Sequence, residues 1–185
     1  MIGTFVVTCE PKNERCAQTF NVLSAYYRSA DKSSRGSLRS EQGSMFRDDT
    51  VYDFVDQARR EKGYYFCIAL PPGDYAFHTI DFYNYSGGGT GYSVREENQF
   101  NLPYSLAPGE VVYVGRLKVT TTIGQNIFGM KLKAPGALLL SNNATESAAA
   151  LQKCPENVRG RTVRDASLKV AMANGNPLVQ ANPGQ

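Results

Sequence analysis

The chain contains no tryptophan, a single histidine, and no C-x-x-C pair among its four cysteines. Zinc sites and thioredoxin-like redox sites rely on closely spaced Cys or His, so neither is expected here. The sequence has no G-x-S-x-G motif that could supply a serine nucleophile for a triad with His78. A lone histidine within a strand usually packs or forms a hydrogen bond. We therefore assign no catalytic residue, no metal ligand and no cofactor, and the sequence predicts a protein that is not an enzyme.

Long apolar runs and strong charge are also missing. No run approaches the roughly 18 residues that a membrane-spanning helix needs. A formal net charge of +3 with scattered Lys and Arg gives no basic stripe, which argues against a nucleic-acid partner. Residues 2–7 are too short an apolar segment for a signal peptide, so we expect a soluble body whose export signal has been removed.

The cysteines are even in number, which favours two disulfides formed in an oxidising compartment. A polar stretch at residues 10–15 separates two β segments and would place Cys9 opposite Cys16. Elimination then pairs Cys67 with Cys154. The alternative of four buried, reduced thiols that act as small hydrophobic side chains stays open.

Two similar phrases, LPPGDY at residues 70–75 and LAPGEV at residues 106–111, each close one apolar run and open another. Pro sets a negative φ and Gly accepts a positive one, which is typical of a turn between strands. Residues 110–122 alternate clearly, with Leu117 on one face and Arg116 on the other, which predicts a strand with one solvated face. Further strands are predicted at residues 4–9, 19–28, 64–70, 75–84, 99–102, 128–133 and 137–140.

So many strands are best buried by packing sheet on sheet. The fold class we predict is mainly β, an antiparallel β-sandwich with one or two short α-helices. Apolar residues at helical spacing predict a helix over residues 51–58, and a capping box from Asn143 to Glu146 predicts another that carries Leu151 and stops before Pro155. Residues 29–49 are expected to form a long surface loop with a short strand within it.

One domain suits a chain of 185 residues. We place the β-sandwich domain at residues 1–158 and an extended, partly disordered tail at residues 159–185. Apolar density falls after Arg159, and Asn, Gly, Pro and Gln dominate the end of the chain. We expect this tail to be removable.

Tyrosines are the remaining candidates for binding. Tyr83, Tyr85, Tyr92 and Tyr104 lie in sequence around the Gly-rich segment at residues 86–91, and tyrosine is enriched at recognition surfaces. A plain alternative is that these rings cover the end of the sandwich and hold the loop in place. The absence of tryptophan makes a sugar-stacking platform a weaker interpretation.

The segments at residues 70–77 and 107–115, followed by a strand and a helix that ends at Cys154 and Pro155, resemble a known pattern. They are similar to bacterial envelope lipoproteins of uncharacterised type with a transthyretin-like or carboxypeptidase-regulatory-like β-sandwich, over roughly residues 60–155. The resemblance implies export, an N-terminal lipidated cysteine and a periplasmic sandwich without a cofactor. The sequence has no lipobox, so such a lipid anchor would lie outside this chain, and no functional residue can be transferred.

Our expectation for function is a non-enzymatic cell-envelope protein of the bacterial periplasm or outer membrane. It would act as a structural or protein-interaction module with an envelope protein as its partner. Contact with the membrane is expected only through the lipid anchor. The alternative is a ligand-binding module that takes a glycan or peptide at the tyrosine-flanked, Gly-rich loop.

Overall fold

A computed structural model of the protein describes residues 1–10, 15–42, 50–85 and 91–183. Among these residues the strands form a seven-stranded first sheet and a five-stranded second sheet. The first sheet contains β1 (Ile2–Thr8), β4 (Phe54–Asp56), β5 (Glu61–Cys67), β9 (Val111–Gln125), β10 (Lys131–Ser141), β11 (Val163–Asp165) and β12 (Val179–Ala181). The second sheet contains β2 (Val22–Ser29), β3 (Arg35–Glu41), β6 (Gly73–Tyr85), β7 (Gly91–Val94) and β8 (Leu102–Leu106).

Strand order in the first sheet is β12-β10-β9-β1-β5-β4, and β11 also pairs with β9. This sheet is mixed, because β1 runs parallel to β9, β11 runs parallel to β9, and β12 runs parallel to β10. The prediction of purely antiparallel sheets was wrong for this sheet. These parallel neighbours are far apart in sequence, and long crossovers are what parallel pairing requires.

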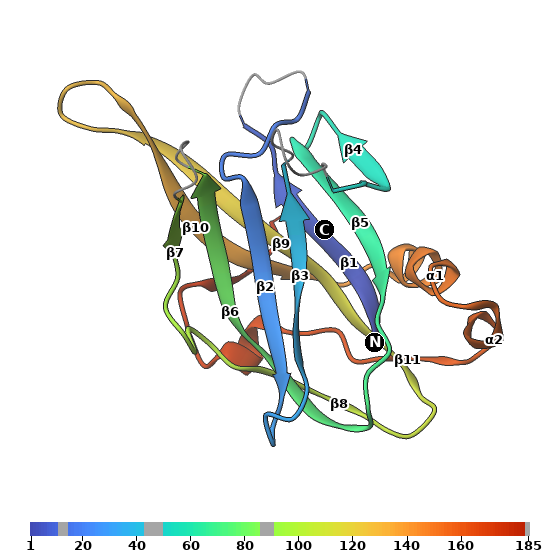
Figure 1. Cartoon of the computed structure of the whole chain (residues 1–185). Coiled ribbons are helices and arrows are strands. Elements are labelled where there is room, and N and C mark those ends of the chain that lie inside the picture. Colours follow the sequence, from blue (N-terminus) through green and yellow to red (C-terminus); the bar gives the residue numbers. More distant parts are fainter. Residues whose placement is uncertain (11–14, 43–49, 86–90, 184–185) are drawn as a thin grey trace.

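The second sheet is antiparallel throughout, in the order β3-β2-β6-β7, with β8 paired to β6. The strands β7 and β8 pair with opposite ends of the long strand β6. Figure 1 shows β2, β3 and β6 side by side, with no described helix over their outward face.

The core lies between the two sheets. Phe5 and Leu117 from the first sheet and Leu23, Phe77 and Leu102 from the second belong to one buried cluster. A mainly β fold of two packed sheets is therefore confirmed.

Two helices, α1 (Ala144–Gln152) and α2 (Glu156–Arg159), lie at the outer side of the first sheet (Figure 1). Asn143 caps α1 as predicted, with its side chain accepting a hydrogen bond from the Thr145 amide. A second small cluster, formed by Ile2, Val111, Tyr113, Ala150 and Cys154, packs α1 onto this sheet. None of the helices in the described ranges is long and apolar enough to cross a membrane.

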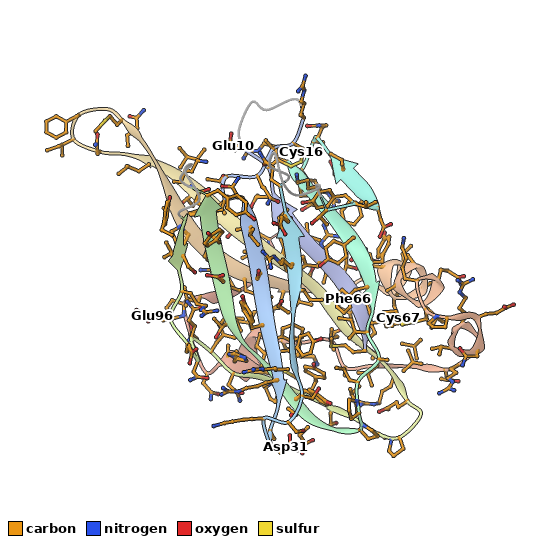
Figure 2. The ribbon with its side chains drawn as sticks, viewed as in Figure 1. Glu10, Cys16, Asp31, Phe66, Cys67 and Glu96 are labelled. Atoms are coloured by element: carbon orange, nitrogen blue, oxygen red, sulfur yellow. A yellow bond between two sulfur atoms is a disulfide. The ribbon has the colours of Figure 1, made fainter. Side chains whose placement is uncertain are left out.

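Both predicted cysteine pairs are present as disulfides, Cys9–Cys16 and Cys67–Cys154. The second joins the end of β5 to the segment after α1 (Figure 2). No cysteine remains free. Two disulfides indicate an oxidising, extracytoplasmic environment. Of the polar loop predicted before Cys16, residues 11–14 lie outside the described part of the chain.

The helix predicted over residues 51–58 is absent. Residues 54–56 form the edge strand β4, which pairs with β5, and Val51 and Val55 are exposed. The apolar spacing there is real, but a short run cannot distinguish a helix from a strand that finds a partner. Of the surface loop predicted over residues 29–49, residues 43–49 lie outside the described residues. In the rest, the strand is longer than predicted, because β3 spans seven residues and forms a hairpin with β2.

The end of the chain differs from the expected extended tail. It contributes β11, a 3₁₀ helix η1 (Val170–Ala173) and β12. Leu168, Ala173 and Val179 from this segment are buried in the main core. The low density of apolar residues in this segment did not predict that these three side chains are buried in the core.

Candidate functional site

The β6–β7 hairpin brings together three of the four predicted tyrosines. Tyr83 and Tyr85 lie at the end of β6, and Tyr92 lies on β7, paired with Asn84. The rings of Tyr83 and Tyr85 meet edge to face with centroids 5.1 Å apart. Because cross-strand partners share a face, Tyr83 and Tyr85 point outward from the second sheet and Tyr92 lies on the opposite side of the hairpin. We call these three residues the tyrosine hairpin.

Polar contacts fix this hairpin to the neighbouring strands. The Tyr85 hydroxyl donates to the Glu41 carboxylate on β3 at 2.5 Å, and the Tyr85 amide donates to the Asn21 side chain at 2.8 Å. The Asn84 side-chain amide donates to the Tyr92 hydroxyl at 3.1 Å. A Cβ at Gly91 would overlap the Tyr83 phenol, so glycine is needed there for close approach. Residues 86–90, most of the predicted Gly-rich loop, lie outside the described residues.

Tyr104 does not belong to this site. It lies on β8 with its ring stacked on Tyr75, centroids 5.7 Å apart, and it is buried in the core between the sheets. Burial raises the pKa of its hydroxyl well above the ordinary value. Proximity in sequence to the Gly-rich segment was misleading, because β8 pairs with the far end of β6.

A cavity of about 510 Å³ opens on the same outward face of the second sheet, toward the turn between β2 and β3. Four cationic side chains and one carboxylate line it, together with Tyr26, His78 and Thr79. The cations are Arg28, Lys32, Arg35 and Arg95, and the carboxylate is Glu97. Figure 2 labels Asp31 and Glu96, which neighbour the two segments that form its rim.

The cationic side chains of the cavity form no ion pair with the described carboxylates. Arg28 donates to the Asn98 side chain at 2.7 Å, and Arg95 lies over the Tyr26 ring, 5.4 Å from its centroid. Within the described residues none of the four cations has a carboxylate within 4.0 Å. Burial and the positive charges of Arg28 and Arg95 lower the pKa of His78, which Glu97 opposes. The cavity is therefore a region of positive potential.

Sequence reasoning missed this cavity because its basic residues come from three separate segments. Arg28 lies next to the last residue of β2, Lys32 lies in the turn that follows, Arg35 begins β3, and Arg95 follows β7. The β2–β3 hairpin brings the first three together, and the pairing of β6 with β2 and with β7 adds Arg95. His78, which the sequence indicates to be structural, lies in the cavity wall and contacts the Thr79 hydroxyl at 2.7 Å.

A second charged cluster is buried on the other side of the molecule. Arg116 on β9 contacts Glu61 at 2.5 Å and also pairs with Glu146 of α1, while Lys118 contacts Glu61 at 2.8 Å. The sequence predicted a solvated face for this strand, but Arg116 is only 3% exposed because α1 covers it. Since every charge in the cluster has an opposite partner, we interpret it as structural.

Comparisons of the chain with protein-family models, with curated proteins and with solved structures find no match. The function must therefore be argued from the geometry of the chain itself.

Proposed function

We propose that the protein is a non-enzymatic interaction module of the bacterial cell envelope, in the periplasm or at the outer membrane, that docks a partner protein through the tyrosine hairpin. The observation that carries the proposal is the pair of partly exposed rings of Tyr83 and Tyr85 on an outward sheet face that no described helix covers, with the exposed ring of Tyr92 on the other side of the same hairpin. Tyrosine offers a large contact area at low cost in side-chain entropy. The two disulfides support a location outside the cytoplasm.

The sequence pattern at residues 70–77 and 107–115 supports the same proposal. Its resemblance to envelope lipoproteins with a transthyretin-like sandwich agrees in outline with two packed β-sheets, although the mixed first sheet is a departure. An N-terminal lipid anchor outside this chain would fit that resemblance.

Site-specific photo-crosslinking in native cells tests the docking proposal. A photoreactive residue in place of Tyr92 should give a discrete protein adduct, and Tyr83→Ala in the same chain should weaken it. The matched control is the same residue in place of Val51, which is exposed on the first sheet's side of the molecule. Equal adducts from both positions, or none from position 92, would contradict the proposal. Raising the salt concentration should change the yield little, because the contact is mainly apolar.

A ligand-binding module is the second candidate, and the basic cavity favours it. Its volume lies within the range of small-molecule sites, and its charge selects an acidic ligand. Of the glycans and peptides expected from the sequence, those that carry carboxylates fit best, since Arg pairs with carboxylate through two hydrogen bonds.

His78 provides the readout for this second candidate, because it is the only histidine. Tetra-aspartate or oligogalacturonate should raise the pKa of His78, measured by NMR, whereas tetra-asparagine and maltotetraose should not. A bound anion favours the charged imidazole, against the effect of Arg28 and Arg95. Arg35→Gln and Arg95→Gln should abolish the response, and Arg59→Gln, an exposed arginine elsewhere, should preserve it. An unchanged His78 titration with both acidic probes would exclude this function.

A further inference from the structure

The tip of the β9–β10 hairpin exposes a group of large apolar side chains. Ile127 is 93% exposed, Phe128 79%, Met130 58% and Leu132 51%. We call these four residues the hairpin tip. The sequence predicts a half-buried core strand over residues 128–133, and the structure instead places its apolar residues in solvent. A contiguous apolar surface of this kind on a folded domain generally marks a contact site.

The hairpin tip stands clear of the rest of the molecule (Figure 1). Pairing of β9 with β1 ends at Val119, and pairing of β10 with β12 begins at Leu138. Beyond those points β9 and β10 pair only with each other among the described strands. The hairpin tip can therefore enter a lipid environment without displacing any packed helix or strand.

Asn126 and the turn backbone form hydrogen bonds with several backbone groups of the turn. The Asn126 side chain accepts from the amides of Phe128 and Met130 at 3.0 and 2.9 Å. The Asn126 amide donates to the Met130 carbonyl, and the Gly129 amide donates to the Asn126 carbonyl. Each backbone N–H or C=O group that is already hydrogen-bonded lowers the free-energy cost of moving the turn into lipid.

Charge around the hairpin tip is favourable for an anionic surface. The sequence has no Asp or Glu between Glu110 and Glu146, and the exposed Lys133 lies beside the tip. Basic residues next to an inserted apolar segment are attracted by anionic headgroups, and no acidic residue on this hairpin opposes that attraction.

We propose that the hairpin tip inserts into the interfacial region of an anionic phospholipid bilayer and so holds the protein against a membrane surface. An apolar turn with internal hydrogen bonds and a neighbouring cation suits the membrane interface, where acyl chains accept apolar side chains and anionic headgroups attract the cation. A segment that binds in a protein groove usually carries a polar side chain that fixes its orientation there. Positions 127–130 carry no polar side chain. This inference does not depend on the partner or ligand proposed for the second sheet.

Tryptophan fluorescence gives a direct test, since the chain has no tryptophan of its own. Phe128→Trp in the full, oxidised chain should shift its emission to the blue on addition of vesicles of phosphatidylglycerol and phosphatidylcholine, and brominated lipid should quench it. Val51→Trp, at another highly exposed apolar position, should do neither. Pure phosphatidylcholine vesicles should bind more weakly, and salt should weaken binding to the mixed vesicles.

Co-sedimentation of the unlabelled protein supplies the second measurement. Ile127→Ser with Phe128→Ser should reduce partitioning into the mixed vesicles by at least about tenfold, because much of the apolar area that would leave water is removed. Lys133→Gln should reduce it less. The proposal is overturned if Phe128→Trp shows no shift with mixed vesicles, or if the double serine variant binds as well as the parent. Self-association that the double variant abolishes, with no vesicle binding, would assign the tip to a second copy and also overturn it.

Discussion

Glu61 is the residue on which the buried charges of the first sheet converge. It accepts from Arg116 at 2.5 Å and lies 2.8 Å from the Lys118 ammonium, and its side chain is 4% exposed. The Arg116 guanidinium also lies 5.5 Å from the centroid of the Phe54 ring. Without Glu61, Arg116 would keep Glu146, but Lys118 would lose its carboxylate partner, so two buried cations would share one carboxylate. A buried charge that loses its compensation is more harmful than never having the pair.

We therefore expect Glu61→Gln to lower the free energy of unfolding by about 3–5 kcal/mol. Urea denaturation monitored by circular dichroism would measure it. Asp56→Asn is the control, because Asp56 pairs with Arg59 at 3.8 Å on the surface and should contribute less than about 1 kcal/mol. A loss at Glu61 no larger than the loss at Asp56 would show that the cluster is solvated in solution.

Gly109 illustrates what the turn phrases contribute. Its φ is +72°, and Gly73 in the other phrase has a φ of +148°, so the prediction of positive φ at both glycines is confirmed. An added Cβ at Gly109 would meet only ordinary contact, with the Arg161 side chain 3.6 Å away. The cost of a side chain there comes from the backbone conformation alone.

Gly109→Ala should accordingly reduce stability by about 1 kcal/mol. The control is Gly124→Ala in β9, where nothing lies within 4 Å of the added Cβ and φ is not in the left-handed range. That variant should be neutral or slightly stabilising, because alanine restricts the unfolded chain. Equal thermal midpoints for the two variants would contradict this account.

At the scale of elements, the sequence predicts a strand well where one strand face meets the core. Leu117 and Val119 alternate with outward residues and are buried, which is why β9 was found. The same alternation in Phe128, Met130 and Leu132 led to a wrong expectation, because a period of two indicates extended backbone but not what covers it. The basic cavity was not predicted, because His78 and Arg95 join the basic β2–β3 hairpin only through the long-range pairing of β6 with β2 and the β6–β7 hairpin.

The last strand, β12, gives an element-scale test of the tail. Val179 is 2% exposed, and β12 pairs with β10 from Leu138 to Leu140. Deletion of residues 175–185 should therefore destabilise the protein by about 2–3 kcal/mol or more, the value of burying one such side chain. Deletion of residues 183–185 alone should have little effect, because it leaves β12 and the bond from the Asn182 amide to the Leu140 carbonyl in place. Unchanged urea midpoints in both would support the original expectation of a removable tail.

An ion pair between the β8–β9 turn and β11 should make stability depend on pH. Arg164 pairs with Glu110, and the Ala107 amide donates to the same carboxylate at 2.9 Å. These contacts lower the pKa of Glu110 from 4.5 to about 2. A carboxyl whose pKa is lowered on folding stabilises the protein above its unfolded pKa and loses that effect as pH falls through the folded one.

The difference in stability between the parent and Glu110→Gln should then be constant above about pH 5, shrink to a small remainder at pH 2 and vanish below it. Denaturation series at several pH values would measure it. Arg164→Gln should give a smaller pH-dependent part, because the Ala107 amide still donates to Glu110, and a pH-independent loss from the missing bond to the Ser105 carbonyl. A difference in stability that is as large at pH 2 as at pH 7 would mean that packing, not charge, explains the effect.

For the whole molecule, the three surfaces with candidate roles are separate. The tyrosine hairpin and the basic cavity lie on the second sheet, while the hairpin tip extends from β9 and β10 beyond both sheets. Helices α1 and α2 and the Cys67–Cys154 disulfide close the outer side of the first sheet. Contact at the hairpin tip can therefore occur while the second sheet remains available.

The two disulfides should contribute unequally to this architecture. Cys67–Cys154 closes a sequence separation of 87, against 7 for Cys9–Cys16. In the chain-entropy model the longer loop restricts the unfolded state by about 4–5 kcal/mol and the shorter by about 2–3 kcal/mol. Urea unfolding of Cys67→Ala with Cys154→Ala should thus show a larger loss than Cys9→Ala with Cys16→Ala, and the long bridge should also keep α1 against the sheet. Equal losses of stability would contradict the chain-entropy account of the long disulfide. Free thiols in peptides from the unreduced protein would remove the basis for an oxidising compartment.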